Sequence, residues 1–430
     1  MRGRLRVCLL LLLTAGCRVP APVAPPRTAV PSVREAHREL PIVAPATPIL
    51  DGKGLPATAG KKPEEPARTF RGLGRDDCLN LAARQATTAN LLDQENRVPK
   101  PASECNAASE QVRQTIRLHL ALELRNSAAS EALDRYFQLA GSEARADLVR
   151  KAFPIVDDLH DRAKRAKAAG LRFPLEPSDL ELQRSQLQGQ LDQLELGSRL
   201  LNVDLKRRLG LPAEPPGDRL WPQGDFTIDP TPVEAEEAAK TALSDRPELR
   251  GLRALYHGLT VESLPDARDY LKAVTSFLGG SRPPLPIRRL EKMLDRRAGP
   301  DPARLAELEV RRSQLHDLIL SRERQVADEA RAAAITLNAQ TVRATLARDR
   351  VRIWEEKLAE AVKKREANQP GAELQEPQVR LDLLKARGEL AGEVAAWHQA
   401  WVKYRAVLGS LARETAPEGK PKVETPGNSQ

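Results

Sequence analysis

Apolar residues in this chain recur three and four positions apart, with charged and amide residues between them. The clearest seam lies near the C-terminus and consists of Leu383, Ala386, Leu390, Val394, Trp397, Trp401, Tyr404, Leu408 and Leu411. One extra step of four interrupts the alternation, which is the spacing of a coiled-coil seam with a stutter. A second seam, interrupted by polar Ser198, consists of Leu187, Leu191, Leu194, Leu201, Leu205 and Leu209. Both patterns predict long helices that bury one narrow face.

Two longer helical runs precede these seams. Residues 110–169 contain a single proline, Pro154, and residues 302–369 contain none after Pro302. About 60 helical residues at 1.5 Å per residue would form a rod roughly 90 Å long. We expect Pro154 to kink its rod without ending it.

The same order of segments occurs twice along the chain. Glu176-Pro177 opens a helical run that closes on Leu209-Gly210, and Glu376-Pro377 opens one that closes on Leu408-Gly409. The two runs are offset by about 200 residues, and each follows one of the long rods, so each copy is predicted to be a long antiparallel helical hairpin. The resulting division is residues 1–16 signal peptide, 17–68 tether, 69–210 first hairpin repeat, 211–231 linker, 232–413 second hairpin repeat and 414–430 disordered tail.

The N-terminus has the features of an export signal. Three arginines within residues 2–6 precede an apolar run at residues 7–13, which is too short to span a bilayer as a permanent helix. Residues 13–17, Leu-Thr-Ala-Gly-Cys, resemble the bacterial lipoprotein box, which implies that Cys17 is lipidated. The alternative is an ordinary signal peptide with a chance cysteine. Arg18, in place of Asp, is permissive for the outer membrane by the same resemblance, and the proline-rich residues 19–68 would act as a tether.

Composition agrees with long solvated helices. Aromatic residues make up 3% of the chain and charged residues 30%, and the mean hydropathy is −0.47. The formal charge of +9 raises the question of nucleic-acid binding. Because basic and acidic residues alternate along every helix without a basic block, we expect no nucleic-acid partner.

The sequence contains no pattern typical of an enzyme. The six histidines are scattered, and neither Gly-x-Ser-x-Gly nor His-Glu-x-x-His occurs. We therefore expect no catalytic residue, cofactor or metal. Cys78 and Cys105 could form a disulfide in an oxidising compartment, and two free thiols are the alternative.

Several segments resemble the TolC-type outer-membrane efflux proteins. Residues 136–171 are similar to the family's first long helix and the Gly-Leu that ends it. Residues 242–250, ALSDRPELR, resemble its Arg-Pro-Glu/Asp-Leu signature, and the segments ending at Gly210 and Gly409 resemble its closing helices. The resemblance implies two tandem helical hairpins, a homotrimeric periplasmic tunnel, and partners in a periplasmic adaptor (membrane fusion) protein and an inner-membrane transporter.

The resemblance also assigns residues at the hairpin tips. Gly170-Leu171 and Ser178-Asp179 resemble the tip motif that contacts the adaptor, and Asp382 resembles an entrance carboxylate that threefold symmetry would turn into a ring. The alternative is purely structural, with Gly170 as a helix C-cap and Asp179 and Asp382 as first-turn carboxylates.

The chain departs from the family where membrane strands are expected. Residues 93–108 are polar, residues 265–278 read as an amphipathic helix, and residues 282–297 are basic and broken by prolines. The predicted fold is therefore all-α, with two tandem repeats of long antiparallel helical hairpins and little or no β-barrel. The predicted function is efflux by an oligomeric periplasmic tunnel, lipid-anchored at the outer membrane. The alternative is a coiled-coil scaffold lipoprotein that conducts nothing.

Overall fold

The computed structural model describes residues 40–45, 50, 69–98, 107–171, 173–212, 218–224, 226–274, 302–369 and 371–414. Four long helices dominate it: α4 (Ala107–Ala168), α5 (Pro177–Arg208), α10 (Pro302–Glu366) and α11 (Ala372–Val407). The 62 residues of α4 and the 65 of α10 make rods of roughly 95 Å. Pro154 lies inside α4, and the helix continues through it as expected.

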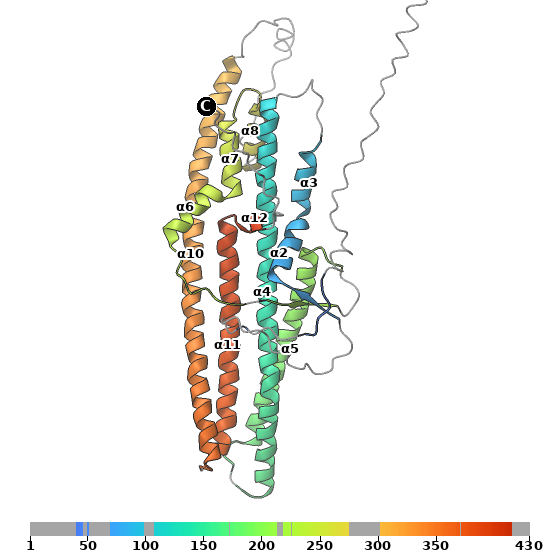
Figure 1. Ribbon diagram of the computed structural model, residues 1–430, viewed down its shortest axis with the longest axis vertical. Helices are drawn as coiled ribbons and strands as arrows, with labels where there is room; N and C mark the ends of the chain where they lie inside the picture. The colour runs from blue at the N-terminus through green and yellow to red at the C-terminus, as the bar shows by residue number, and fades with distance from the viewer. Residues whose placement is uncertain are drawn as a thin grey trace, which may run out of the picture.

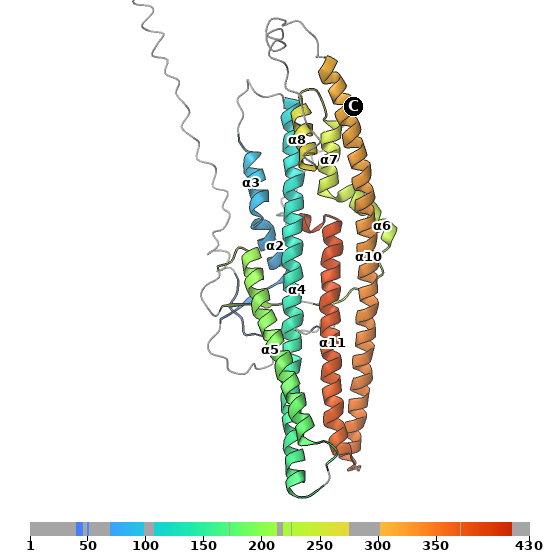
Figure 2. The same cartoon turned by 180° about the vertical axis from the view of Figure 1, so that it is seen from behind.

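The long helices stand side by side in a single row. α10 packs against α11, α11 against α4, and α4 against α5, so the first and second hairpins meet through α4 and α11 (Figures 1 and 2). Consecutive helices in the row run in opposite directions. The predicted all-α fold with two long hairpins is confirmed, and α5 and α10 form the two edges of the row.

Each hairpin is preceded by a pair of short helices. The first pair is α2 (Arg75–Arg84) and α3 (Thr87–Glu95), and the second is α6 (Ala235–Asp245) and α7 (Pro247–His257). Each closing helix ends at a glycine with positive φ, Gly210 at 63° and Gly409 at 69°. A Cβ on Gly210 would lie 2.5 Å from Gln85, between α2 and α3, and one on Gly409 would lie 2.6 Å from Pro247, the first residue of α7. The duplication seen in the sequence therefore includes how each closing helix packs on its short pair.

The first closing helix begins where the sequence placed it, and the second does not. Pro177 is the first residue of α5, a position where the missing N–H costs nothing. In the second copy α11 begins at Ala372, so Pro377 lies inside it. The early start follows from Gly371, whose φ of 81° lets the chain turn sharply before the helix.

The main core lies at mid-height between α4, α5 and α11. Tyr136 and Phe137 of α4 are each 1% exposed, and the Phe137 ring stacks on His398 of α11 with centroids 4.5 Å apart. The Tyr136 hydroxyl donates a hydrogen bond to the carbonyl of Gln223, 2.6 Å away. This contact joins the core to a small sheet in which β1 (Phe70–Leu73) and β2 (Arg219–Pro222) pair in parallel.

Parts of the predicted tether and linker belong to this folded body. The Val43 N–H donates to the Phe70 carbonyl and the Gly72 N–H to the Pro41 carbonyl, both at 2.8 Å, so the chain around Ile42 pairs with β1. Leu40 and Leu50 are each 4% exposed. These residues fall within the predicted tether, residues 17–68, and β2 falls within the predicted linker, residues 211–231. Strands this short give no periodic signal, so the sequence does not predict these contacts.

A second helical cluster lies at the end of the molecule opposite the hairpin tips (Figure 1). There α8 (Leu264–Val274) packs with α7 and α10 through Ala267, Leu271 and Leu315, which confirms the predicted amphipathic helix. α12 (Leu411–Glu414) packs against α4. Among the residues described, no helix combines the length and apolar character that crossing a bilayer requires.

Candidate functional site

The tip of the first hairpin exposes the residues predicted there. Gly170 ends α4 with φ of 68°, and the Leu171 N–H donates to the Ala166 carbonyl at 2.9 Å. This is the hydrogen bond of a Schellman cap, so Gly170 does serve as the C-cap that the structural reading expected. The Leu171 side chain is 67% exposed, and a Cβ on Gly170 would meet nothing within 4 Å. The cap therefore presents an apolar side chain at the apex.

Ser178 and Asp179 lie in the first turn of α5 and are both exposed. The Asp179 N–H donates to the Glu176 carbonyl at 3.1 Å, and its carboxylate stands at the positive end of the helix dipole. The next residue, Leu180, is only 2% exposed. Ser178 and Asp179 thus share the apex with Leu171, and their contact with a partner stays a prediction.

The two tips are joined by an apolar cluster. Leu180 of the first hairpin and Leu381 of the second belong to one buried group with Val156 and Leu159 of α4, and Leu374 packs against it. Since each hairpin contributes leucines, the tips hold each other in place.

The second tip contains a buried carboxylate paired with two half-exposed arginines, which no pattern in the sequence predicts. Glu376 is 2% exposed and binds Arg365 of α10 at 2.6 Å and Arg380 on its own helix. Glu-Pro at positions 376 and 377 was interpreted only as a helix start. The acid in fact joins α10 to α11, since leaving a buried carboxylate without a partner would be costly.

Asp382, the predicted entrance carboxylate, lies on α11 some distance from the second tip. It is about ten residues into α11, roughly 15 Å along the helix, and its half-buried side chain lines a long groove. Its role as an entrance carboxylate stays a prediction.

The groove runs along one face of the four-helix row and has a volume of about 1310 Å³. All four long helices line it, represented by Arg145 of α4, Gln190 of α5, Arg343 of α10 and Asp382 of α11. None of its lining residues comes from the short helices or the small sheet. The row is therefore hollowed on a face that the short elements leave open.

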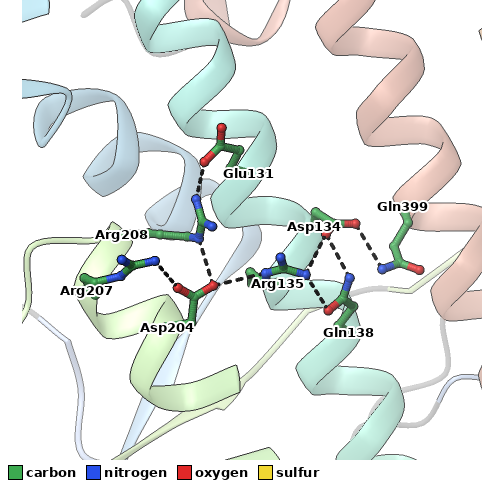
Figure 3. Close-up of polar contacts among 8 residues, drawn as sticks. All are labelled: Glu131, Asp134, Arg135, Gln138, Asp204, Arg207, Arg208 and Gln399. Carbon is green, nitrogen blue, oxygen red and sulfur yellow. Dashed lines mark hydrogen bonds and ion pairs between the residues drawn. The ribbon is translucent and has the colours of Figure 1, made fainter. Parts of the chain in front are cut away.

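A polar network links three of the four long helices (Figure 3), and its members Gln138 and Gln399 also line the groove. Asp204 of α5 accepts hydrogen bonds from Arg135 of α4 at 3.1 Å, Arg208 at 2.9 Å and Arg207 at 2.6 Å. Burial alone would raise the pKa of Asp204, but the three arginines outweigh it and lower the pKa to about 2. The side-chain amide of Gln399 on α11 donates to Asp134 of α4 at 3.0 Å, so the network links α5, α4 and α11.

The Arg-Pro-Glu-Leu segment forms a clamp between α7 and α10. Glu248 receives two hydrogen bonds from Arg322 of α10, at 2.5 and 2.9 Å, and Arg246 pairs with Glu329 of the same helix. Two arginine–carboxylate pairs of opposite polarity fix the short helix against the rod. The segment that carried part of the family resemblance thus has a structural role.

The outer edges of the row carry exposed apolar stripes. On α5 the stripe consists of Leu182, Leu196, Leu200 and Val203, and on α10 of Ile335, Val342, Leu346 and Ile353. The stripe residues are 14, 4 and 3 positions apart on α5 and 7, 4 and 7 apart on α10, so each set lies on one face of its helix. Leu346 also borders the groove. Exposed apolar side chains aligned on one helix face make each edge a candidate contact surface.

Of the three cysteines with a predicted role, the structure describes only Cys78. Cys78 is completely buried, and burial raises the pKa of its thiol. Cys105 and Cys17 lie outside the described residues, so the disulfide and the lipidation stay predictions. In the part of the chain that is described, no group of three or more His, Cys, Asp or Glu residues could hold a metal ion.

Comparisons with known proteins identify the fold. No protein-family model and no curated protein matches the chain. Among solved structures, the CmeC outer membrane channel of Campylobacter jejuni matches with a TM-score of 0.51 and 10% identity over 78% of this chain and 85% of that one. The open-state MtrE outer membrane channel of Neisseria gonorrhoeae matches with a TM-score of 0.52 and 11% identity over 80% and 91%. CusC, whose structures concern transmembrane channel formation, matches with a TM-score of 0.53 and 10% identity over 78% and 91%.

Proposed function

We propose that this protein, which has the fold of the TolC-type outer-membrane efflux channels, associates with further copies of itself through the two edges of its helical row. The product is a tube of long helices that carries solutes across the cell envelope. The proteins that share the fold are channels and not enzymes, which agrees with the role expected from the sequence.

The apolar edge stripes carry this proposal. Leu200 of α5 and Val342 of α10 both lie about 35 Å along their helices from the hairpin tips, and Leu196 and Leu346 both lie at about 30 Å. The α5 stripe of one copy can therefore meet the α10 stripe of the next at the same level. Because α5 and α10 run in opposite directions, the contact continues the alternation of the row.

Such a contact joins two different surfaces, so it closes into a ring when the rotation between copies permits. The resemblance to the TolC-type proteins implies three copies in the ring. The tips would meet a periplasmic adaptor linked to an inner-membrane transporter, and lipid on Cys17 would hold the body at the outer membrane. The apical, exposed Leu171 supports the adaptor contact, since an apolar side chain at an apex gains from burial against a partner.

Cysteine cross-linking in the cell envelope tests the assembly. The pair Leu200→Cys and Val342→Cys should form disulfide-linked oligomers, because α5 and α10 of one chain lie at opposite edges of its row (Figure 2). The control pair Leu200→Cys and Leu305→Cys places the second thiol about 90 Å from the tip end of α10 and should give none. Absence of linked oligomers for the matched pair would favour the coiled-coil scaffold, which needs no ring.

A further inference from the structure

The wall of the groove is rich in neutral amides. Gln183, Gln186, Gln190 and Gln193 follow one another three, four and three positions apart on α5, and all four line the groove. Further glutamines line it from α4 and α11. Because an amide both donates and accepts hydrogen bonds without carrying charge, this surface solvates polar groups of either kind.

The charged residues of the wall nearly balance. The lining contains four basic side chains, Arg145, Arg343, Arg350 and Lys385, and three acidic ones, Asp382, Glu389 and Glu393. Arg350 lies 3.5 Å from Glu389, and the Gln340 amide donates to Glu393. Both charged lining residues of α10 are basic, and three of the four on α11 are acidic, so the two signs lie side by side across the wall.

Three glycines leave parts of the wall without side chains, although a side chain would fit at each position. Gly197 of α5 and Gly388 and Gly392 of α11 lie in helix interiors and line the groove. A Cβ on any of the three would meet nothing within 4 Å. Glycine in a helix interior costs about 0.5–1 kcal/mol relative to alanine, so these positions give up helix stability and leave the groove wider.

We infer that the groove is the inner wall of the proposed tube, and that its cargo consists of polar, hydrogen-bonding organic solutes of low net charge. The inference rests on the proposed function and names its substrate class. Selection for metal cations or for polyanions would require successive rings of the same sign. Repetition of these wall residues around a symmetry axis would instead place acidic and basic rings close to one another. The glutamines of the wall offer such solutes replacements for their water hydrogen bonds, and apolar side chains of the wall such as Leu187 and Leu194 can contact their carbon skeletons.

Adding negative charge to the wall tests the inference. In cells lacking the native gene, the triple variant Gln186→Glu, Gln190→Glu and Gln193→Glu is compared with wild type by the accumulation of three fluorescent probes. The probes have similar size, one being zwitterionic, one cationic and one anionic. Export of each probe by the variant is divided by its export by wild type. Because both use the same inner-membrane pump, the preference of the pump cancels in this ratio.

The expected result is at least about a fivefold loss of anionic-probe export, with export of the zwitterionic probe within about twofold of wild type. Replacing the same three glutamines by lysine should produce the opposite preference. Gln188→Glu is the matched control, since Gln188 is exposed, lies outside the groove and bonds Asp192 at 2.8 Å. The Gln188→Glu variant should export all three probes at the wild-type level.

The outcomes separate the two proposals. Wild-type cells that export none of the probes would contradict the proposed function itself. Wild-type export with both triple variants matching Gln188→Glu would show that the groove does not face the cargo. Wild-type export of the cationic or anionic probe alone would overturn the neutral-cargo assignment and leave the tube in place.

Discussion

The α5 edge stripe offers the sharpest perturbation of the assembly. Leu196 and Leu200 are 60% and 63% exposed in the single chain, so the double change Leu196→Ala and Leu200→Ala removes little of its core. Burying a leucine fully contributes about 1.5–3 kcal/mol, and more than half of that remains to be gained at each position. Each contact between copies should therefore weaken by roughly 2–4 kcal/mol, or about 30- to 1000-fold.

Light scattering coupled to size-exclusion chromatography measures this effect on the full-length protein extracted in detergent. The double variant should dissociate at concentrations where wild type stays assembled, with unchanged helicity. Leu118→Ala with Leu120→Ala is the matched control, because these side chains of α4 are 48% and 47% exposed and lie away from the edge. Equal masses for the edge variant and wild type across a dilution series would refute the edge-to-edge contact.

Four further predictions concern the tip, the anchor, the polar network and the cysteines. Leu171→Glu should abolish adaptor pull-down without loss of helicity, because the side chain is 67% exposed; retained pull-down and compound resistance would contradict the tip assignment. Cys17→Ser should release the protein from membranes, and salt-resistant fractionation with the outer membrane would contradict lipid anchoring. The lowered pKa of Asp204 stabilises the folded state above the unfolded pKa near 4. About 1–2 kcal/mol should therefore be lost between pH 4 and pH 2, and Asp204→Asn should remove that part of the acid sensitivity of the melting temperature. Digestion without reduction should yield linked Cys78 and Cys105 peptides, a bridge contributing roughly 3 kcal/mol; two free thiols in purified periplasmic material would exclude it.

Periodicity made the long helices predictable. Seams repeated over about six to eight turns specify helix and buried face together. The seam through Leu390, Val394 and Trp397 is accordingly buried as expected. The Leu-Gly endings were informative because a positive φ favours glycine, and both glycines cap their helices.

Features that depend on tertiary contact were not predictable. The start of α11 at Ala372 depends on the turn at Gly371, and nothing local to Pro377 marks it as interior. Nothing in the sequence distinguishes Glu376 from an exposed acid, and only the fold brings Arg365 and Arg380 to its carboxylate. Charged residues occur throughout these helices, so only the packing reveals which ones are buried.

The candidate site was predicted in part. Gly170, Leu171, Ser178 and Asp179 do lie together at one exposed apex, because a helical hairpin must turn somewhere between its two runs. The groove was not foreseen, since its wall combines residues from four helices far apart in sequence. A glutamine repeat at 183, 186, 190 and 193 was the available signal, and it indicated a helix face without indicating what that face encloses.

Electron microscopy of the full-length protein extracted in detergent tests the central claim most directly. Edge-to-edge association predicts closed particles with a hollow axis, in which α5 of each copy contacts α10 of the next and the groove faces inward. Solid single rods of four long helices at concentrations found in the envelope would contradict the tube and leave the fold without the assembly that efflux requires.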